Sequence, residues 1–111
     1  MSAFIKNIEH GQALTLEGQV TYQPGQIVSK TLAQNDHHSL TLFAFAEGEE
    51  ISTHASDGDA LVTALDGTGR ITIEGKTHQL DAGESIIMPA GKPHAVFAQT
   101  PFKMLLTVIF D

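Results

Sequence analysis

The chain has 111 residues, of which 41% are hydrophobic, so it has the size of one domain with a single core. The formal net charge is −7 at pH 7 and the six Lys and Arg residues are scattered, which argues against binding to a nucleic-acid backbone. The absence of cysteine excludes disulfides, thiolate metal sites and a cysteine nucleophile, so any metal would need His, carboxylate or water ligands.

No stretch of the sequence has the character of a targeting or membrane segment. The first residues lack the apolar core of a signal peptide, and no run approaches the roughly 20 apolar residues of a spanning helix. The lack of cysteine also fits a reducing compartment. We therefore expect a soluble cytoplasmic protein with no membrane or nucleic-acid partner.

The first third of the chain predicts few elements. Residues 4–16 show only a weak pattern and are left unassigned. Pro24 and Gly25 signal a turn, and residues 27–32 then form a predicted strand. Asn35 and Asp36 break the chain, so the next strand begins after them.

Two predicted strands are apolar on both faces. Over residues 39–46, leucines and alanines alternate with Thr41, Phe43 and Phe45, and residues 102–110 follow a similar pattern. A strand that is wet on one side carries polar residues there, so a second sheet or subunit is expected to cover the outer faces. One domain of this size cannot cover both sides of two strands, which predicts a homodimer.

The rest of the chain alternates short strands with tight turns. Strands are predicted over residues 51–54, 60–65, 70–74, 77–80 and 85–88. Turn signals recur roughly every eight to twelve residues and no segment keeps a helical period, which favours an all-β sandwich or barrel.

The stretch 83–94 organises the remaining sequence. A compact apolar strand over residues 85–88 runs into Pro89-Ala90-Gly91, where proline presets the turn and glycine can take a positive φ. Pro93 cannot sit within a central strand, so the next strand begins near His94. His94 is therefore expected to be held by rigid backbone on both sides.

These positions carry a resemblance to a known family. The stretch 83–98 resembles the second sequence motif of the cupins, and the stretch 48–67 resembles the first. The matching residues are Gly48, His54 and Gly67 in the first motif and Gly83, Pro89, Gly91 and His94 in the second. The resemblance implies one domain over residues 1–111 that folds as a double-stranded β-helix (jelly-roll) barrel, often dimeric, with the motif histidines converging in a central pocket.

The resemblance also implies a metal that this chain is poorly equipped to hold. Cupins commonly bind Fe, Mn, Ni or Zn through three histidines and a glutamate, but Ser56 and Ala60 stand where the second histidine and the glutamate are expected. Ala98 replaces the asparagine that ends the second motif. Asp57 and Asp59 could supply a carboxylate, although acidic residues beside a glycine in a turn usually serve the backbone.

His54 and His94 therefore have two interpretations. They are either ligands of one divalent metal or a hydrogen-bonded, metal-free pair of pocket histidines, and the residues leave both open. In either case the matching positions point inward. The side chains that share their strand parity or lie beside them predict a small, mostly apolar ligand pocket lined by Ser56, Ala60, Val62, Val96 and Ala98.

The other histidines offer no second site. His37 and His38 are adjacent, so on a strand they would point to opposite faces, and a solvated loop is expected. His10 and His78 are expected at the surface. No serine lies in a nucleophile motif.

Three functions remain open from the sequence. The first is a barrel that binds a small molecule, with His54 or His94 available as an acid or base. The second is a metal-dependent dioxygenase, isomerase or lyase. The third is a non-catalytic dimeric binding or sensor module.

Overall fold

The computed structural model describes residues 4–111, so the first three residues of the expected domain lie outside the described residues. It contains one short 3-10 helix and nine strands. The elements are η1 (Glu17–Gln19), β1 (Ile27–Gln34), β2 (His38–Phe45), β3 (Glu50–His54), β4 (Asp59–Asp66), β5 (Thr68–Ile73), β6 (Lys76–Asp81), β7 (Ser85–Met88), β8 (His94–Ala98) and β9 (Phe102–Ile109). No helix among residues 4–111 has the length and hydropathy that a membrane crossing requires.

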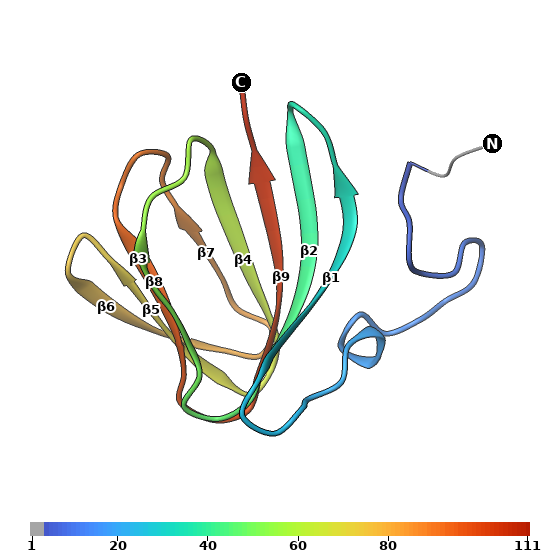
Figure 1. Cartoon of the computed structure of the whole chain (residues 1–111), viewed down its shortest axis with the longest axis horizontal. Coiled ribbons are helices and arrows are strands. Elements are labelled where there is room, and N and C mark those ends of the chain that lie inside the picture. Colours follow the sequence, from blue (N-terminus) through green and yellow to red (C-terminus); the bar gives the residue numbers. More distant parts are fainter. Residues whose placement is uncertain (1–3) are drawn as a thin grey trace.

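The strands form two antiparallel sheets that face each other (Figure 1). The five-stranded sheet has the order β1-β2-β9-β4-β7, and the four-stranded sheet has the order β3-β8-β5-β6. Strands distant in sequence are neighbours in both sheets, as the jelly roll requires. The expectation of an all-β double-stranded β-helix is confirmed.

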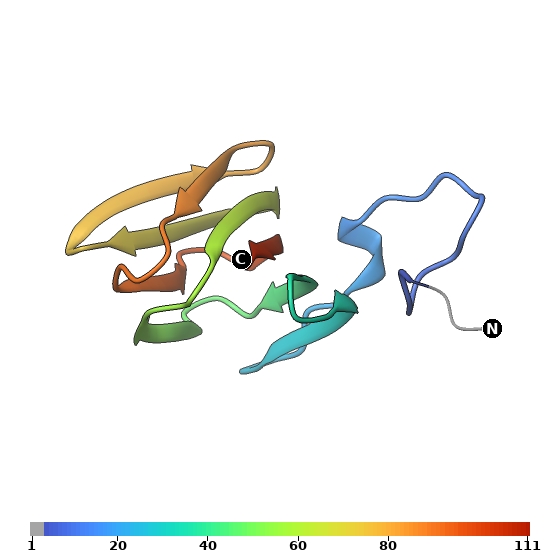
Figure 2. The same ribbon diagram turned by 90° about the horizontal axis from the view of Figure 1, so that it is seen from above.

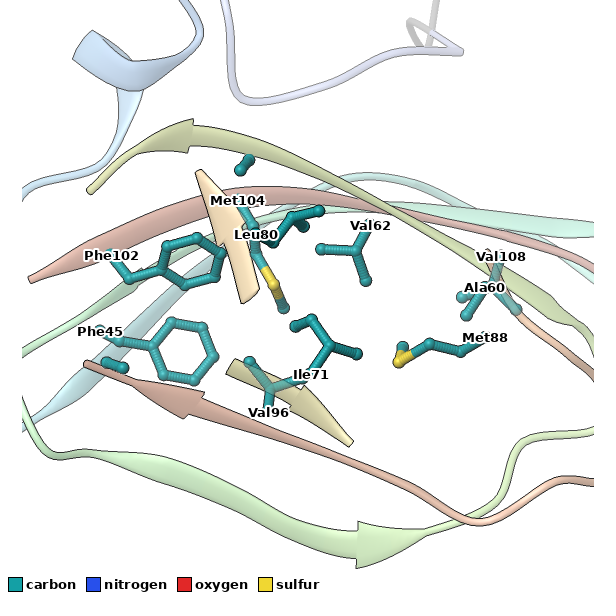
Figure 3. Close-up of a cluster of buried hydrophobic side chains, with 12 residues drawn as sticks. Phe45, Ala60, Val62, Ile71, Leu80, Met88, Val96, Phe102, Met104 and Val108 are labelled. Atoms are coloured by element: carbon teal, nitrogen blue, oxygen red, sulfur yellow. The ribbon is translucent and has the colours of Figure 1, made fainter. Parts of the chain in front are cut away.

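The core lies between the inner faces of the two sheets, because inward residues alternate along each strand. Its largest fully buried members include Phe45, Phe102 and Ile71. The rings of Phe45 and Phe102 lie 6.0 Å apart at one end of the cluster, and Met88 lies with Ala60 and Val108 at the other end (Figure 3).

The outer face of the five-stranded sheet is covered in part by the chain's own N-terminal segment, residues 4–22. Val20 packs with Leu32, Leu42 and Ala44 in a second buried cluster, and Leu16 lies against it. Both views show this segment beside β1 and β2, away from the four-stranded sheet (Figures 1 and 2). The second apolar face of β2 is therefore covered by the same chain, where a second sheet or subunit was expected.

The strands predicted over residues 70–74 and 77–80 place a hairpin turn at Gly75-Lys76, and the structure differs from this by one residue. Glu74 and Gly75 both have positive φ values, of 51° and 80°. Two successive positive φ values define the two-residue turn that suits the twist of a β-hairpin. The turn is therefore at Glu74-Gly75, and Lys76 already belongs to β6.

Candidate functional site

The turn before β8 places His94 at the first position of that strand. Gly91 has a φ of 74°, and the Lys92 amide donates to the Pro89 carbonyl at 3.2 Å, which closes the turn. The Gly91 amide also donates to the Ser56 carbonyl at 2.8 Å. This bond ties the β7–β8 turn to the β3–β4 loop, so the two halves of the site are joined through the backbone.

His54 and His94 meet across the two strands that carry them. They are register partners in the β3–β8 pairing, so their side chains leave the sheet on the same face. The two Nε2 atoms lie 3.2 Å apart, and the rings meet edge to face with centroids 4.4 Å apart. The sequence prediction that these two histidines face one another is therefore consistent with the geometry.

The two rings differ in their exposure to solvent. His94 is only 2% exposed, because β8 lies between β3 and β5 in the sheet. His54 is exposed, because β3 is an edge strand and the β3–β8 register shifts between Ile51 and His54. The pair therefore connects a buried imidazole to an imidazole that solvent can reach.

The hydrogen bonds determine which ring nitrogen carries the proton in each neutral imidazole. His54 Nδ1 lies 2.9 Å from the Ser52 carbonyl oxygen, which can only accept, so Nδ1 carries the proton and Nε2 is an acceptor. His94 Nε2 then donates to His54 Nε2, and His94 Nδ1 is left as an acceptor. That Nδ1 atom is buried, and no polar group of residues 4–111 forms a hydrogen bond with it.

Burial makes the charged form of His94 unfavourable. Desolvation lowers the pKa of His94 below the ordinary value of 6.5, and a charge on neighbouring His54 lowers it further. A backbone contact at Lys92 acts in the opposite direction. His94 is therefore a neutral imidazole at physiological pH, in which form it can accept a proton or a ligand's hydrogen bond.

Residues 41–110 match the model of the cupin domain family. The chain belongs to the cupins. The matched range includes His54, His94 and both stretches that resemble the cupin motifs.

Solved structures of similar proteins agree with this assignment. A conserved protein of unknown function from Streptococcus pyogenes is 42% identical, with a TM-score of 0.96 over 99% of this chain and 96% of that one. A cupin superfamily protein from Desulfitobacterium hafniense is 33% identical, with a TM-score of 0.93 over 98% of this chain and 100% of that one. None of the curated proteins matches the chain.

A third structure places the same fold inside a longer chain. A cupin 2 conserved barrel domain protein from Leptotrichia buccalis is 45% identical over 84% of this chain, with a TM-score of 0.82. This chain spans 45% of that protein.

Ser56, which stands where cupins place a histidine, and the substitute carboxylates Asp57 and Asp59 do not complete a ligand set beside the pair. Ser56 Oγ donates to the Gly58 carbonyl at 2.7 Å, and Asp59 Oδ1 accepts from the Ala90 amide at 2.8 Å. Asp57 is exposed. No group of three or more His, Cys, Asp or Glu residues gathers at one point among residues 4–111. The two imidazoles alone fall short of the three or four protein ligands that zinc takes, and they lack the carboxylate of the non-haem iron triad.

The residues expected to line an apolar pocket lie in the packed core. Ala60, Val62, Val96 and Ala98 are each 0–2% exposed and belong to one cluster with Met88 and Ile71. Two hollows of about 340 and 220 Å³ lie elsewhere, against the N-terminal segment, lined by Asn7, Ile8, Glu9 and Gln19 and by Ile5, Ile8, Glu9, His10 and Gly11.

The remaining histidines stand apart from the pair. His10, His37 and His38 are exposed. His38 is the first residue of β2, so the expectation that both adjacent histidines lie in a loop was wrong for His38. His10 Nε2 donates to the Ile5 carbonyl at 2.6 Å. His78 is half-buried, because its register partner is the core residue Ile71, and the expectation of a surface position was wrong.

Sequence reasoning missed one residue that matters to the site. The Ser52 carbonyl fixes the tautomer of His54 from two residues earlier in the same strand. Any residue could supply that carbonyl, so no side-chain signal marks the position. The register of β3 against β8 shifts between Ile51 and His54, the stretch that contains this contact.

Proposed function

We propose that this cupin binds a small organic molecule with a polar end at the histidine pair. The main support for this proposal is the contact between the two imidazoles, whose Nε2 atoms lie 3.2 Å apart. The ring of His54 is exposed, and the ring of His94 is buried with no hydrogen bond to its Nδ1 from residues 4–111. A buried acceptor without a partner favours a ligand or water that donates a hydrogen bond to it. The exposed ring of His54 gives such a ligand a point of entry.

The same arrangement supports acid or base chemistry on that ligand. A neutral imidazole can take up a proton as a base, and an imidazolium can release one as an acid. When a ligand gives a proton to His94 Nδ1, the proton on His94 Nε2 can pass to His54 Nε2, which leaves His94 neutral and His54 as the imidazolium. An isomerisation or lyase step is compatible with this pair, as is ligand sensing without turnover.

A divalent metal is the second candidate, and one distance favours it. Two imidazole nitrogens bound to one metal at about 2.1 Å lie about 3.0–3.4 Å apart, which includes the spacing of the pair. The donor set counts against it, because Fe, Mn, Ni or Zn would need further ligands from water or from the bound molecule. A metal-dependent dioxygenase therefore stays the weaker alternative.

One set of variants separates these functions. Two measurements are made on the wild type, His54→Ala and His94→Ala. Elemental analysis gives the metal content of each protein, and ligand-observed NMR gives the binding of a library of small acids, amides and alcohols. His37→Ala is the control, because it removes an exposed histidine elsewhere. We expect compounds that bind the wild type and the control and lose affinity in both other variants. Equal binding by all four proteins would overturn the proposal and leave a scaffold function. Near-stoichiometric metal that disappears in His94→Ala would favour the second candidate.

The proposal also includes assembly and location. We propose that the protein acts as a homodimer in the cytoplasm. The cysteine-free composition supports a reducing compartment. Exposed apolar residues on one sheet face support a partner copy.

A further inference from the structure

The rings of His54 and His94 are each carried by a strand end that adjoins a loop. His54 is the last residue of β3 and is followed by the β3–β4 loop, residues 55–58. His94 is the first residue of β8 and is preceded by the β7–β8 turn, residues 89–93. Both connections lie at the same end of the barrel (Figure 1). The contact between the rings therefore depends on how the loop and the turn are held together.

The strand pairing alone gives His54 little support. Glu50 and Ile51 of β3 pair with β8, but the register then shifts before His54. An irregularity of this kind interrupts the ladder and bends the strand locally. β3 is also an edge strand, with β8 as its neighbour in the sheet. Contacts outside the strand pairing therefore have to fix His54 against His94.

Two hydrogen bonds from adjacent amides of the turn supply such contacts. The Gly91 amide donates to the carbonyl of Ser56, two residues after His54, at 2.8 Å. The Ala90 amide donates to Asp59 Oδ1, also at 2.8 Å. Because the peptide units are planar, only the φ and ψ angles of Ala90 separate the two bonds. The bond to Asp59 therefore limits the orientations that the Gly91 amide can take.

The pairing of β4 with β7 places Asp59 beside the turn. Asp59 is the first residue of β4, and the next residue, Ala60, pairs with Met88 at the end of β7. Aspartate commonly binds backbone amides in turns, and an ionised carboxylate is a stronger acceptor than a neutral oxygen. Any residue at position 56 could supply the carbonyl that Gly91 binds, whereas the bond from Ala90 depends on the side chain of Asp59.

The other end of the turn is anchored independently of Asp59. The Glu74 amide, in the β5–β6 hairpin, donates to the Pro93 carbonyl at 2.9 Å. β8 is also paired on both sides, with β3 and with β5. Loss of the bond to Asp59 should therefore loosen residues 89–91 without unfolding the barrel.

We propose that Asp59 is a positioning residue, which fixes the β7–β8 turn through the Ala90 amide and so keeps the rings of His54 and His94 in contact. The role needs an oxygen acceptor at Oδ1, which asparagine also offers and alanine does not. Asp57 lies in the neighbouring loop and is exposed, so it is the matched carboxylate for comparison. The value of this geometry for a bound molecule rests on the proposed function, whereas the geometry itself does not.

Three variants test the role of Asp59. Asp59→Ala removes the acceptor, Asp59→Asn keeps it without the charge, and Asp57→Ala is the control. Urea unfolding gives the stability of each protein. NMR of the ligand-free proteins gives the nuclear Overhauser effect (NOE) between the two rings and the shifts of their nitrogens, with signals assigned from His54→Ala and His94→Ala. Hydrogen exchange of the Ala90 amide in the wild type tests the bond without a substitution.

We expect the NOE between the rings to be lost in Asp59→Ala and kept in Asp59→Asn and in the control, with a protected Ala90 amide in the wild type. An Asp59→Ala protein that is less stable but keeps the NOE and the nitrogen shifts would overturn the proposal, because the role of Asp59 would then be structural only. Loss of the NOE in Asp59→Asn or in Asp57→Ala would also overturn it. An Ala90 amide that exchanges as fast as in an unfolded chain would do the same.

These measurements need no ligand, so they separate this inference from the proposed function. A wild type that binds none of the tested acids, amides and alcohols would refute the proposed function and leave the role of Asp59 intact. A wild type that binds one of them, with an unchanged ring contact in Asp59→Ala, would refute only the role of Asp59.

Discussion

Replacement of Gly67 by alanine should destabilise the protein through two separable effects. Gly67 joins β4 to β5 with a φ of 73°, a conformation that costs an L-residue about 1–2 kcal/mol. A Cβ atom there would overlap the Pro101 carbonyl oxygen and lie 2.7 Å from Thr100 Oγ1. Such overpacking costs about 1–3 kcal/mol, so the sum is about 2–5 kcal/mol. That is a large share of the 5–15 kcal/mol that typically stabilises a domain.

The control is Gly75→Ala, because Gly75 has a φ of 80° with open space around its Cβ position. It should cost only the conformational part, about 1–2 kcal/mol. Urea unfolding of the two variants and the wild type measures both values, provided that the m-values agree. Equal destabilisation by the two substitutions would show that the contact with Pro101 is not rigid, and the packing argument would be refuted.

Three further predictions concern the site and the core. The pKa of His94 is lowered in the folded protein, so the unfolded chain binds a proton first as the pH falls, and the free energy of unfolding should be full above about pH 6.5 and fall as the pH drops towards the folded pKa. Urea unfolding at several pH values measures this, with His94→Gln to isolate the contribution of His94. A His94 that titrates at or above 6.5 by NMR would contradict the prediction. Tyr22→Phe should lower the free energy of unfolding by about 0.5–1.5 kcal/mol, because the Tyr22 hydroxyl donates to the Asp66 carboxylate at 2.5 Å. Burial and this hydrogen bond both raise the pKa of Tyr22. An unchanged midpoint of urea unfolding would argue against the bond. Ile71→Val should cost about 0.5–1.5 kcal/mol by thermal or urea unfolding, since Ile71 is fully buried, and a neutral result would indicate a loosely packed core.

Local chemistry made the region around His94 predictable from the sequence. Proline and glycine restrict the backbone within a few residues, so the strand over residues 85–88, the following turn and the start of β8 agree with the structure. The hairpin at Glu74-Gly75 was placed one residue late, because Glu74 is not among the residues that usually adopt a positive φ.

Packing between segments far apart in the sequence was harder to predict. Residues 4–22 have no regular period, so nothing in their pattern predicted that Val20 would cover Leu42 on β2. The exposure of His54 was also hidden, because it depends on β3 being an edge strand. A motif match identifies which histidines meet, whereas the order of strands in the sheet decides which of them solvent can reach.

The place of β9 constrains how the barrel can assemble. This strand follows all the others in the chain order, yet it pairs with both β2 and β4 in the middle of the five-stranded sheet. Until Phe102–Ile109 has left the ribosome, β2 and β4 each carry an unpaired edge with apolar side chains. Such non-local pairing is slow because loop-closure entropy is lost before contacts form. The nascent chain therefore passes through an interval in which aggregation competes with folding, and that interval ends only when β9 is inserted.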